Sequence, residues 1–301
     1  MSAIELSDDQ LLTLVIEVDA ALFAAGEDIK QRSFNVPREV MRRLGYVSFV
    51  LFGEGTPEVL SRIREQFSRL YCARDLAVGG HIGVFMFRDV FARVGVPHAY
   101  GQQVRIVPIE HVELTDVQEA ILARDAVAFE AYHDQFADLF DVECGIREMR
   151  SSYASMELVE RFLNLARLHL HGAAAILTGG FDHRGAVQSG LLATELALKA
   201  LVASTGLNEE EIREGYGHRV SDLVDDIEAK WPAFDAARVR RVMSANPKFV
   251  ANRYAKEQPA RVAVGHIVIG AQYIAAEVRR QLSDRNFRQN GGPPWARKYP
   301  A

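Results

Sequence analysis

Cysteine is scarce in this chain of 301 residues, which contains only Cys72 and Cys144. The two lie far apart in the sequence, so the chain has neither the cysteine spacing of a disulfide framework nor that of a zinc motif. Long apolar runs are also lacking: no stretch of about eighteen apolar residues is free of charges or polar clusters, which argues against a membrane-spanning helix. The first residues, Met1 to Asp9, are acidic where a signal peptide would be basic. We therefore expect a cytoplasmic protein of bacterial type.

The composition is that of a globular protein, with 49% hydrophobic and 25% charged residues, and it excludes a wholly disordered chain. The net charge of −5 conceals a division along the chain. Residues 1–150 carry 15 basic and 24 acidic side chains, whereas residues 151–301 carry 20 and 16. Residues 238–301 hold 13 Lys and Arg against only three acidic side chains. This segment favours an anionic partner, or it complements the acidic half of its own chain.

The first half of the chain mixes helix and strand signals, which predicts an α+β domain of unknown role in residues 1–150. Ser7 begins an amphipathic helix with a capping box, and Thr56 with Pro57 begins a second helix. Dense β-branched and aromatic residues predict strands. The predicted strands cover residues 46–52, 84–87 and 104–107, and a long helix is predicted from Thr115 to about Phe140.

The second half has a wholly helical pattern. Residues 155–177 are nearly continuous in Leu, Ala, Val and Phe, and residues 185–202 are apolar around most of the helix circumference, so we expect both helices to be buried. Asn208 with Glu211 begins a further helix through Ile227, a short basic helix follows Asp235, and an apolar helix runs from about Pro259 to Val278. Such helices must face one another. The sequence predicts a four- or five-helix bundle in residues 151–283, a domain boundary within residues 145–152 and a flexible basic tail in residues 284–301.

Short motifs in the helical half are similar to those of a known family. Residues 193–201 read Ala-Thr-Glu-Leu-Ala-Leu-Lys-Ala-Leu, and they are followed by Gly217-His218 and by Asn252-Arg253-Tyr254 ahead of the last apolar helix. In this order and spacing, residues 152–283 resemble the HEPN domain (higher eukaryotes and prokaryotes nucleotide-binding). The resemblance implies an all-α domain that commonly forms a homodimer and binds RNA or nucleotide. In one branch of the family it implies RNA cleavage by an Arg and a His shortly downstream of it.

In two places of this sequence a histidine follows an arginine at such a short distance: Arg213 with His218, and Arg261 with His266. A histidine can take the proton of a 2′-hydroxyl or protonate a leaving oxygen, and an arginine can stabilise negative charge that develops on phosphorus. These four residues are the candidate catalytic residues of a metal-independent endoribonuclease. Alternatively, His266 is a core histidine bonded to a backbone carbonyl, and His218 is a turn residue that bridges helices.

Arg253, Tyr254 and Lys199 are the candidate ligand-binding residues. Arg253 and Tyr254 would orient a phosphate and a base, or they anchor a helix end, where arginine meets exposed carbonyls favourably. Lys199 follows Glu195 at i,i+4, a pair that is either structural or part of a dimer surface. No cofactor is predicted.

An acidic row in the first half has two interpretations. Asp134, Asp138 and Asp141 recur on one helical face, and their oxygen atoms would suit a hard metal ion. The opposite face of this helix is aromatic, which favours the alternative that the aspartates form the water-exposed side of an amphipathic helix. Three histidines of this half do not have the spacing of zinc ligands, so no metal site is predicted; they are His81, His98 and His111.

These observations together predict a HEPN-like protein that binds RNA or nucleotide through a dimeric helical bundle, with no membrane partner. An interaction or scaffold protein that uses the bundle only for dimerisation stays open as an alternative. The metal-independent endoribonuclease is the second alternative.

Overall fold

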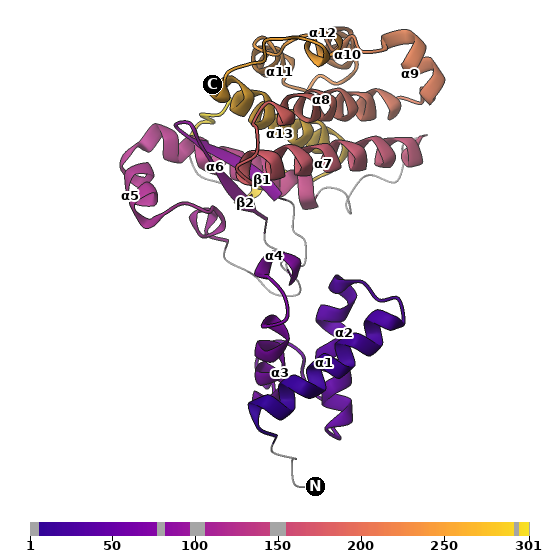
Figure 1. Ribbon diagram of the computed structural model, residues 1–301. Helices are drawn as coiled ribbons and strands as arrows, with labels where there is room; N and C mark the ends of the chain where they lie inside the picture. The colour runs from indigo at the N-terminus through magenta and orange to yellow at the C-terminus, as the bar shows by residue number, and fades with distance from the viewer. Residues whose placement is uncertain (1–5, 77–81, 97–105, 145–154, 292–294, 301) are drawn as a thin grey trace. The chain divides into compact units, whose positions relative to one another are not determined.

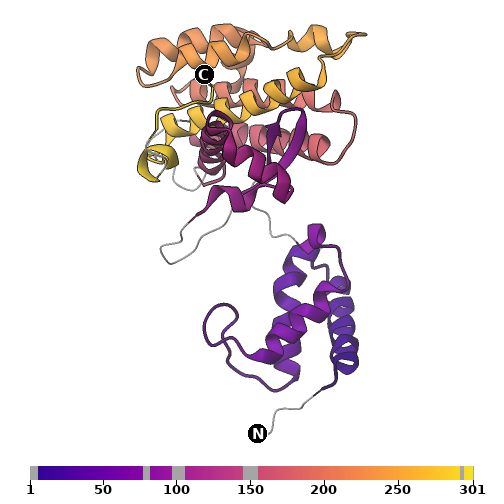
Figure 2. The same ribbon diagram turned by 90° about the vertical axis from the view of Figure 1, so that its left-hand side faces the viewer.

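The computed structural model describes residues 6–76, 82–96, 106–144, 155–291 and 295–300. The chain divides into two compact units, residues 1–79 and residues 80–301, which we call the N-terminal unit and the C-terminal unit. Both are mainly helical, and the C-terminal unit also holds a two-stranded sheet (Figures 1 and 2). The boundary predicted at residues 145–152 lies outside the described residues. The division falls earlier because the sheet and the helix before that point pack against the later helices.

The N-terminal unit consists of α1 (Asp8–Ala24), α2 (Ile29–Arg43), α3 (Glu58–Ser68) and α4 (Ala73–Leu76). The capping box of Ser7 at the start of α1 is confirmed, whereas α2 was not predicted. Helix α3 is confirmed as well, with Pro57 as its N-cap residue. The first three helices share one core. Its fully buried members include Val15, Val18, Val36, Val40, Leu60 and Ile63.

The predicted strand at residues 46–52 is wrong. These residues form an irregular connection between α2 and α3, bounded by Gly45 and Gly53 with φ angles of 89° and 93°. Tyr46 and Phe49 pack against the helical core, while Val47 is fully exposed. A strand needs a hydrogen-bonded neighbour, and the described residues of this unit contain none. The described part of the N-terminal unit is therefore helical and not α+β.

The C-terminal unit begins with an antiparallel hairpin of β1 (Ile82–Phe87) and β2 (Val90–Gly95), in which Val84 pairs with Arg93. The strand predicted at residues 84–87 is thus confirmed, and β2 was missed. Of the strand predicted at residues 104–107, only 106 and 107 are described, and they are not in a strand. The long helix predicted after Thr115 is interrupted at Asp125, which separates α5 (Asp116–Arg124) from α6 (Ala126–Cys144).

The remaining helices follow the predicted order closely. The helix predicted from Asn208 to Ile227 is divided by Gly217, whose φ of 55° a glycine adopts readily. The helices are α7 (Met156–Thr178), α8 (Gly185–Ala203), α9 (Glu209–Tyr216), α10 (Val220–Lys230), α11 (Ala236–Met243), α12 (Phe249–Arg253), α13 (Arg261–Leu282) and α14 (Phe287–Gly291).

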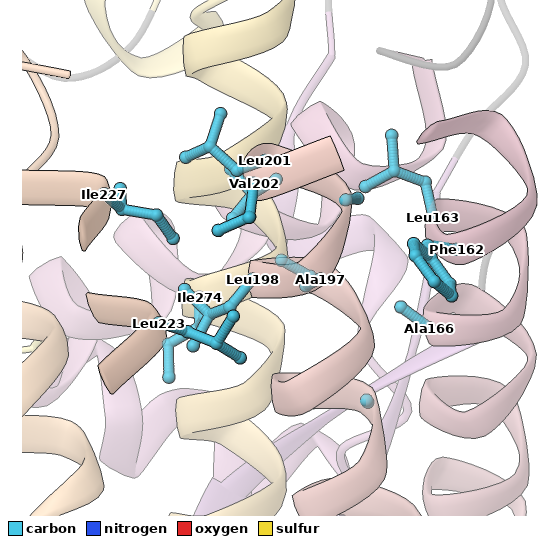
Figure 3. Close-up of a cluster of buried hydrophobic side chains, with 14 of the residues drawn as sticks. Phe162, Leu163, Ala166, Ala197, Leu198, Leu201, Val202, Leu223, Ile227 and Ile274 are labelled. Carbon is cyan, nitrogen blue, oxygen red and sulfur yellow. The ribbon is translucent and has the colours of Figure 1, made fainter. Parts of the chain in front are cut away.

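Helix α8 lies at the centre of the unit, where it packs against α7 and α13. Figure 3 shows the largest core cluster, in which side chains of α7, α8, α10 and α13 meet, among them Phe162, Leu198, Leu223 and Ile274. Among the described helices, α8 alone is long and apolar enough to cross a membrane, but 72% of its apolar segment is buried inside the unit. This is the packing expected of a core helix.

The acidic row on α6 is buried, so its interpretation as a water-exposed face is wrong. Asp134, Asp138 and Asp141 are at most 1% exposed. Arg280 of α13 donates from Nη1 to Asp138 at 2.9 Å and to Asp141 at 3.1 Å. Burial raises the pKa of the Asp138 carboxyl although two arginines lower it, and burial raises that of Asp141 to about 6. The row is the acidic side of an internal ion-pair network.

The same network corrects the prediction of a flexible tail. Arg288 of α14 donates from Nε to Asp134 at 2.5 Å, and Arg297 pairs with Asp138. The Phe287 amide donates to Asp141 at 2.8 Å. The described tail residues 284–291 and 295–300 are therefore held on the C-terminal unit by buried carboxylates that the tail neutralises.

Candidate functional site

The site begins with a buried carboxylate on the core helix α8. Glu195 is 2% exposed, and its Oε1 accepts a hydrogen bond from Lys199 Nζ at 2.7 Å, one helical turn along. The Lys199 side chain is itself only 12% exposed. A buried carboxylate needs such a cation, because an uncompensated charge in the interior is costly. Lys199 thus stabilises the ionised Glu195 and does not reach into solvent.

His218 lies against this carboxylate, directly after the turn at Gly217. Its Nδ1 is 2.9 Å from Oε2 of Glu195 and 3.1 Å from Oε1. Because an ionised carboxylate only accepts hydrogen bonds, the contact places a proton on Nδ1. In the neutral imidazole the lone pair is then on Nε2, which bonds no other described residue. The side chain is 53% exposed. Glu195 therefore fixes the orientation of an imidazole that solvent can reach.

The short helix α12 packs against α8, and its first residue, Phe249, contacts His218. The ring of Phe249 lies 5.2 Å from the imidazole, and the guanidinium of Arg253 lies 4.9 Å from the centre of the Phe249 ring. Tyr254 follows the helix and is 81% exposed. Asn252 is buried, and its Nδ2 has no hydrogen-bond partner among the described residues. We call these four residues, together with His218, the α12 surface.

Lys248 and Lys256 flank the α12 surface in the sequence, and the positive charge there is not neutralised by neighbouring carboxylates. Arg253, Lys248 and Lys256 are exposed, and within the described ranges none of them forms an ion pair. By contrast, Arg238 pairs with Asp235, and Arg240 pairs with two carboxylates. The three cations attract phosphate groups, and the exposed ring of Tyr254 offers a face for stacking.

The other predicted catalytic residues do not join this surface. The guanidinium of Arg213 pairs with Glu210 on α9 at 3.2 Å, and no contact joins it to His218. Arg261 donates to the Asp89 carbonyl at 2.6 Å and lies over the Phe91 ring, so it fastens the hairpin turn to α13. His266 is exposed, contrary to its interpretation as a core histidine. Five residues along a helix amount to about 140° of rotation, so Arg261 and His266 face different directions.

Phe249 and Asn252 are the members of the α12 surface that the sequence did not single out. Phe249 precedes Arg253 by one helical turn, a spacing that favours contact between an aromatic ring and a guanidinium. Nothing in the sequence indicated that α12 would pack against α8. As for metals, no group of three His, Cys, Asp or Glu side chains in the described part of the chain is arranged to hold an ion.

In comparisons with known proteins, no family model matches this chain, and no curated protein or solved structure matches it significantly.

Proposed function

We propose that the C-terminal unit binds single-stranded RNA on the α12 surface. The observation that carries this proposal is the grouping of unneutralised cations, one exposed aromatic ring and a carboxylate-oriented imidazole around one short helix. The resemblance of residues 152–283 to the HEPN domain supports the same class of ligand. Single-stranded nucleic acid suits such a surface because its bases are free to stack while its phosphates follow the charges.

Each part of the surface has a separate role in this proposal. Arg253 and Lys248, with Lys256, bind phosphate oxygens, which contributes affinity without sequence preference. Tyr254, at 81% exposure, provides a face on which a base stacks. Affinity should therefore depend on salt and only weakly on sequence.

Fluorescence anisotropy with a labelled single-stranded RNA tests the proposal. If three cations neutralise three phosphates, the logarithm of the association constant should fall with the logarithm of salt concentration with a slope of about −2. Absence of binding at low ionic strength contradicts the proposal. Binding of a labelled nucleotide without binding of RNA contradicts it as well and supports the nucleotide alternative.

Matched variants locate the binding. Arg253→Ala should weaken binding and reduce the salt slope by about 0.7, whereas Tyr254→Ala should lower affinity without changing the slope. Arg213→Ala and Phe181→Ala are the controls, since they remove another exposed arginine and another exposed aromatic of the same unit. Equal losses in test and control variants would place the RNA elsewhere.

The geometry at His218 favours a second candidate function, metal-independent RNA cleavage. With its proton on Nδ1, His218 can take the 2′-hydroxyl proton on Nε2. The 2′ oxygen then attacks the adjacent phosphorus and the bond to the 5′ oxygen breaks, which leaves a 2′,3′-cyclic phosphate. A water molecule protonates the departing 5′ oxygen, and the hydroxide that remains takes the proton from Nε2 of His218. Arg253 stabilises the negative charge on phosphorus. Glu195 acts by orienting the imidazole and by stabilising the imidazolium.

The cleavage candidate is tested with labelled RNA in the presence of EDTA. His218→Ala should abolish cleavage, and Glu195→Gln should reduce it by a factor of roughly 100 or more while RNA binding persists. His266→Ala is the control, because among the described residues no hydrogen bond, ion pair or ring contact joins His266 to the α12 surface, so it should be dispensable. Wild-type protein that binds RNA but does not cleave it would leave the binding proposal intact and refute cleavage.

The predicted homodimer is part of the proposed function and has its own test. A dimer should give about twice the chain mass of 33.6 kDa in light scattering. A single chain mass at working concentrations would contradict the dimer while leaving the α12 surface unaffected.

A further inference from the structure

The C-terminal unit contains a second polar feature, a cavity that none of the residues of the α12 surface lines. It measures about 820 Å³ and lies between the C-terminal end of α13, the segment around Trp231 and the described tail. Arginines dominate its charged lining, including Arg238, Arg288 and Arg297. A cavity of this size is large enough for a small organic ligand or a nucleotide.

The arginines of the cavity are fixed in place by carboxylates and carbonyls of the unit. Arg288 donates from Nε to Asp134 and from Nη2 to the Trp295 carbonyl at 2.6 Å. Arg238 donates from Nη1 to Asp235 at 2.7 Å and from Nε to the Pro300 carbonyl at 2.9 Å. Such contacts set the guanidinium planes before any ligand arrives, which lowers the entropic cost of binding.

Each of these arginines keeps hydrogen-bonding capacity in reserve. A guanidinium carries five N–H donors. Among the described residues, Nη2 of Arg238 has no hydrogen-bond partner, and the same holds for Nη1 of Arg288 and Nη1 of Arg297. Three pre-positioned guanidinium groups with spare donors are suited to an oxyanion that accepts several hydrogen bonds at once.

The charges around the cavity are arranged in layers. The carboxylates that compensate the arginines are at most 1% exposed; they belong to Asp134, Asp138 and Asp141. By contrast, the side chain of Arg238 is 32% exposed and that of Arg288 is 19% exposed. Five of the described lining residues are arginines, against the three acidic residues Asp235, Glu277 and Asp284, so the lining carries a net positive charge. Of these three, Asp235 is tied to Arg238, Glu277 is tied to Arg280 at 2.9 Å, and Asp284 is exposed.

We propose that this cavity binds a small phosphate-bearing anion, held by Arg238, Arg288 and Arg297. Phosphate oxygens accept hydrogen bonds from fixed arginine forks better than carboxamides or hydroxyls do. The phosphates of a nucleotide and free diphosphate share this chemistry. Because the tail carries two of the arginines, bound anion also stabilises the tail on the unit.

Titration with inorganic diphosphate, followed by tryptophan fluorescence, tests this site. Both tryptophans of the chain report on it, since Trp231 lines the cavity and Trp295 belongs to the tail segment bonded to Arg288. We expect a saturable change with diphosphate that chloride at equal ionic strength does not produce. A parallel titration with ADP separates the sources: tighter binding of ADP identifies a nucleotide, and equal binding identifies free diphosphate. No saturable change with either compound overturns the proposal.

A pair of variants on α11 keeps the test specific. Arg238→Gln should weaken diphosphate binding about tenfold or more, as expected for the loss of one charge-assisted hydrogen bond. Arg238→Lys, which retains the charge but not the fork, should fall between wild type and Arg238→Gln. Arg240→Gln is the control, because Arg240 lies on the same helix but pairs with Asp225 and Glu228. Equal weakening by Arg238→Gln and Arg240→Gln would show unspecific attraction and overturn the proposal.

Discussion

Replacing Arg280 by methionine should destabilise the C-terminal unit strongly, because it removes the cation at the centre of the buried network. The Arg280 side chain is 7% exposed and bonds Asp138, Asp141 and Glu277. Burial lowers the pKa of Arg280, but these three carboxylates outweigh burial and raise it above its ordinary value. Removing one partner of a buried ion pair costs about 3–5 kcal/mol. For a unit of this size, that corresponds to a fall in melting temperature of roughly 10 °C.

The destabilisation should depend on pH in a defined direction. Without Arg280, Asp138 and Asp141 are buried carboxyls whose pKa is raised in the folded state, Asp141 already standing near 6 in the intact protein. A raised folded pKa favours the folded state below that pKa and disfavours it as pH rises through it. The free-energy loss caused by Arg280→Met should therefore be larger at pH 8 than at pH 5.

Urea denaturation followed by tryptophan fluorescence measures this loss in the correct unit, since Trp231 and Trp295 both belong to the C-terminal unit. Arg240→Met is the matched control, because Arg240 also pairs with two carboxylates, but at the surface, where ion pairs contribute little. Equal losses in the two variants, or a loss of Arg280→Met that is the same at both pH values, would refute the reasoning.

Two further predictions concern stability. Burial, together with Arg167, lowers the pKa of the His171 imidazole to about 4 in the folded protein. The unfolded chain binds this proton near pH 6.5, so the free energy of unfolding should fall progressively as pH drops from 6.5 toward 4. The loss should amount to about 2 kcal/mol for this partly exposed side chain. His171→Gln should remove this pH dependence in urea denaturation at pH 7.5 and 4.5, and an unchanged dependence would contradict the assignment. Gly83→Ala should cost about 1–3 kcal/mol, because a Cβ there would lie 2.3 Å from Leu139 Cδ1. Gly172→Ala, which has open space inside α7, should instead raise the melting temperature by the better helix propensity of alanine, and a shift of the same sign in both glycine variants would contradict this packing.

Local signals in the sequence predicted much of the helical structure. The capping boxes of Ser7, Thr115 and Asn208 each satisfy two backbone groups within four residues, so their physics is complete in the sequence. The apolar circumference of α8 likewise indicated burial on all sides. The irregular segment at residues 46–52 shows the limit of such signals, since β propensity forms no strand without a neighbouring strand.

Long-range compensation explains the larger errors. The α6 aspartates have the pattern of a wet helix face, and only partners 139 to 165 residues away make their burial possible. The candidate site is similar, because the contact between His218 and Glu195 joins a turn to a helix 23 residues away along the chain. Arg213 with His218 and Arg261 with His266 do have the spacing of the family's Arg/His pairs. In the structure, however, each arginine bonds another partner, Glu210 for Arg213 and the Asp89 carbonyl for Arg261.

Photo-crosslinking of single-stranded RNA, followed by mass spectrometry of the crosslinked peptides, tests the central claim most directly. Photoactivatable bases react with the aromatic side chains on which they stack. The account predicts crosslinks to the peptide that contains Tyr254, and their loss at high salt. RNA that binds but crosslinks only to other segments would contradict the placement of the site on α12.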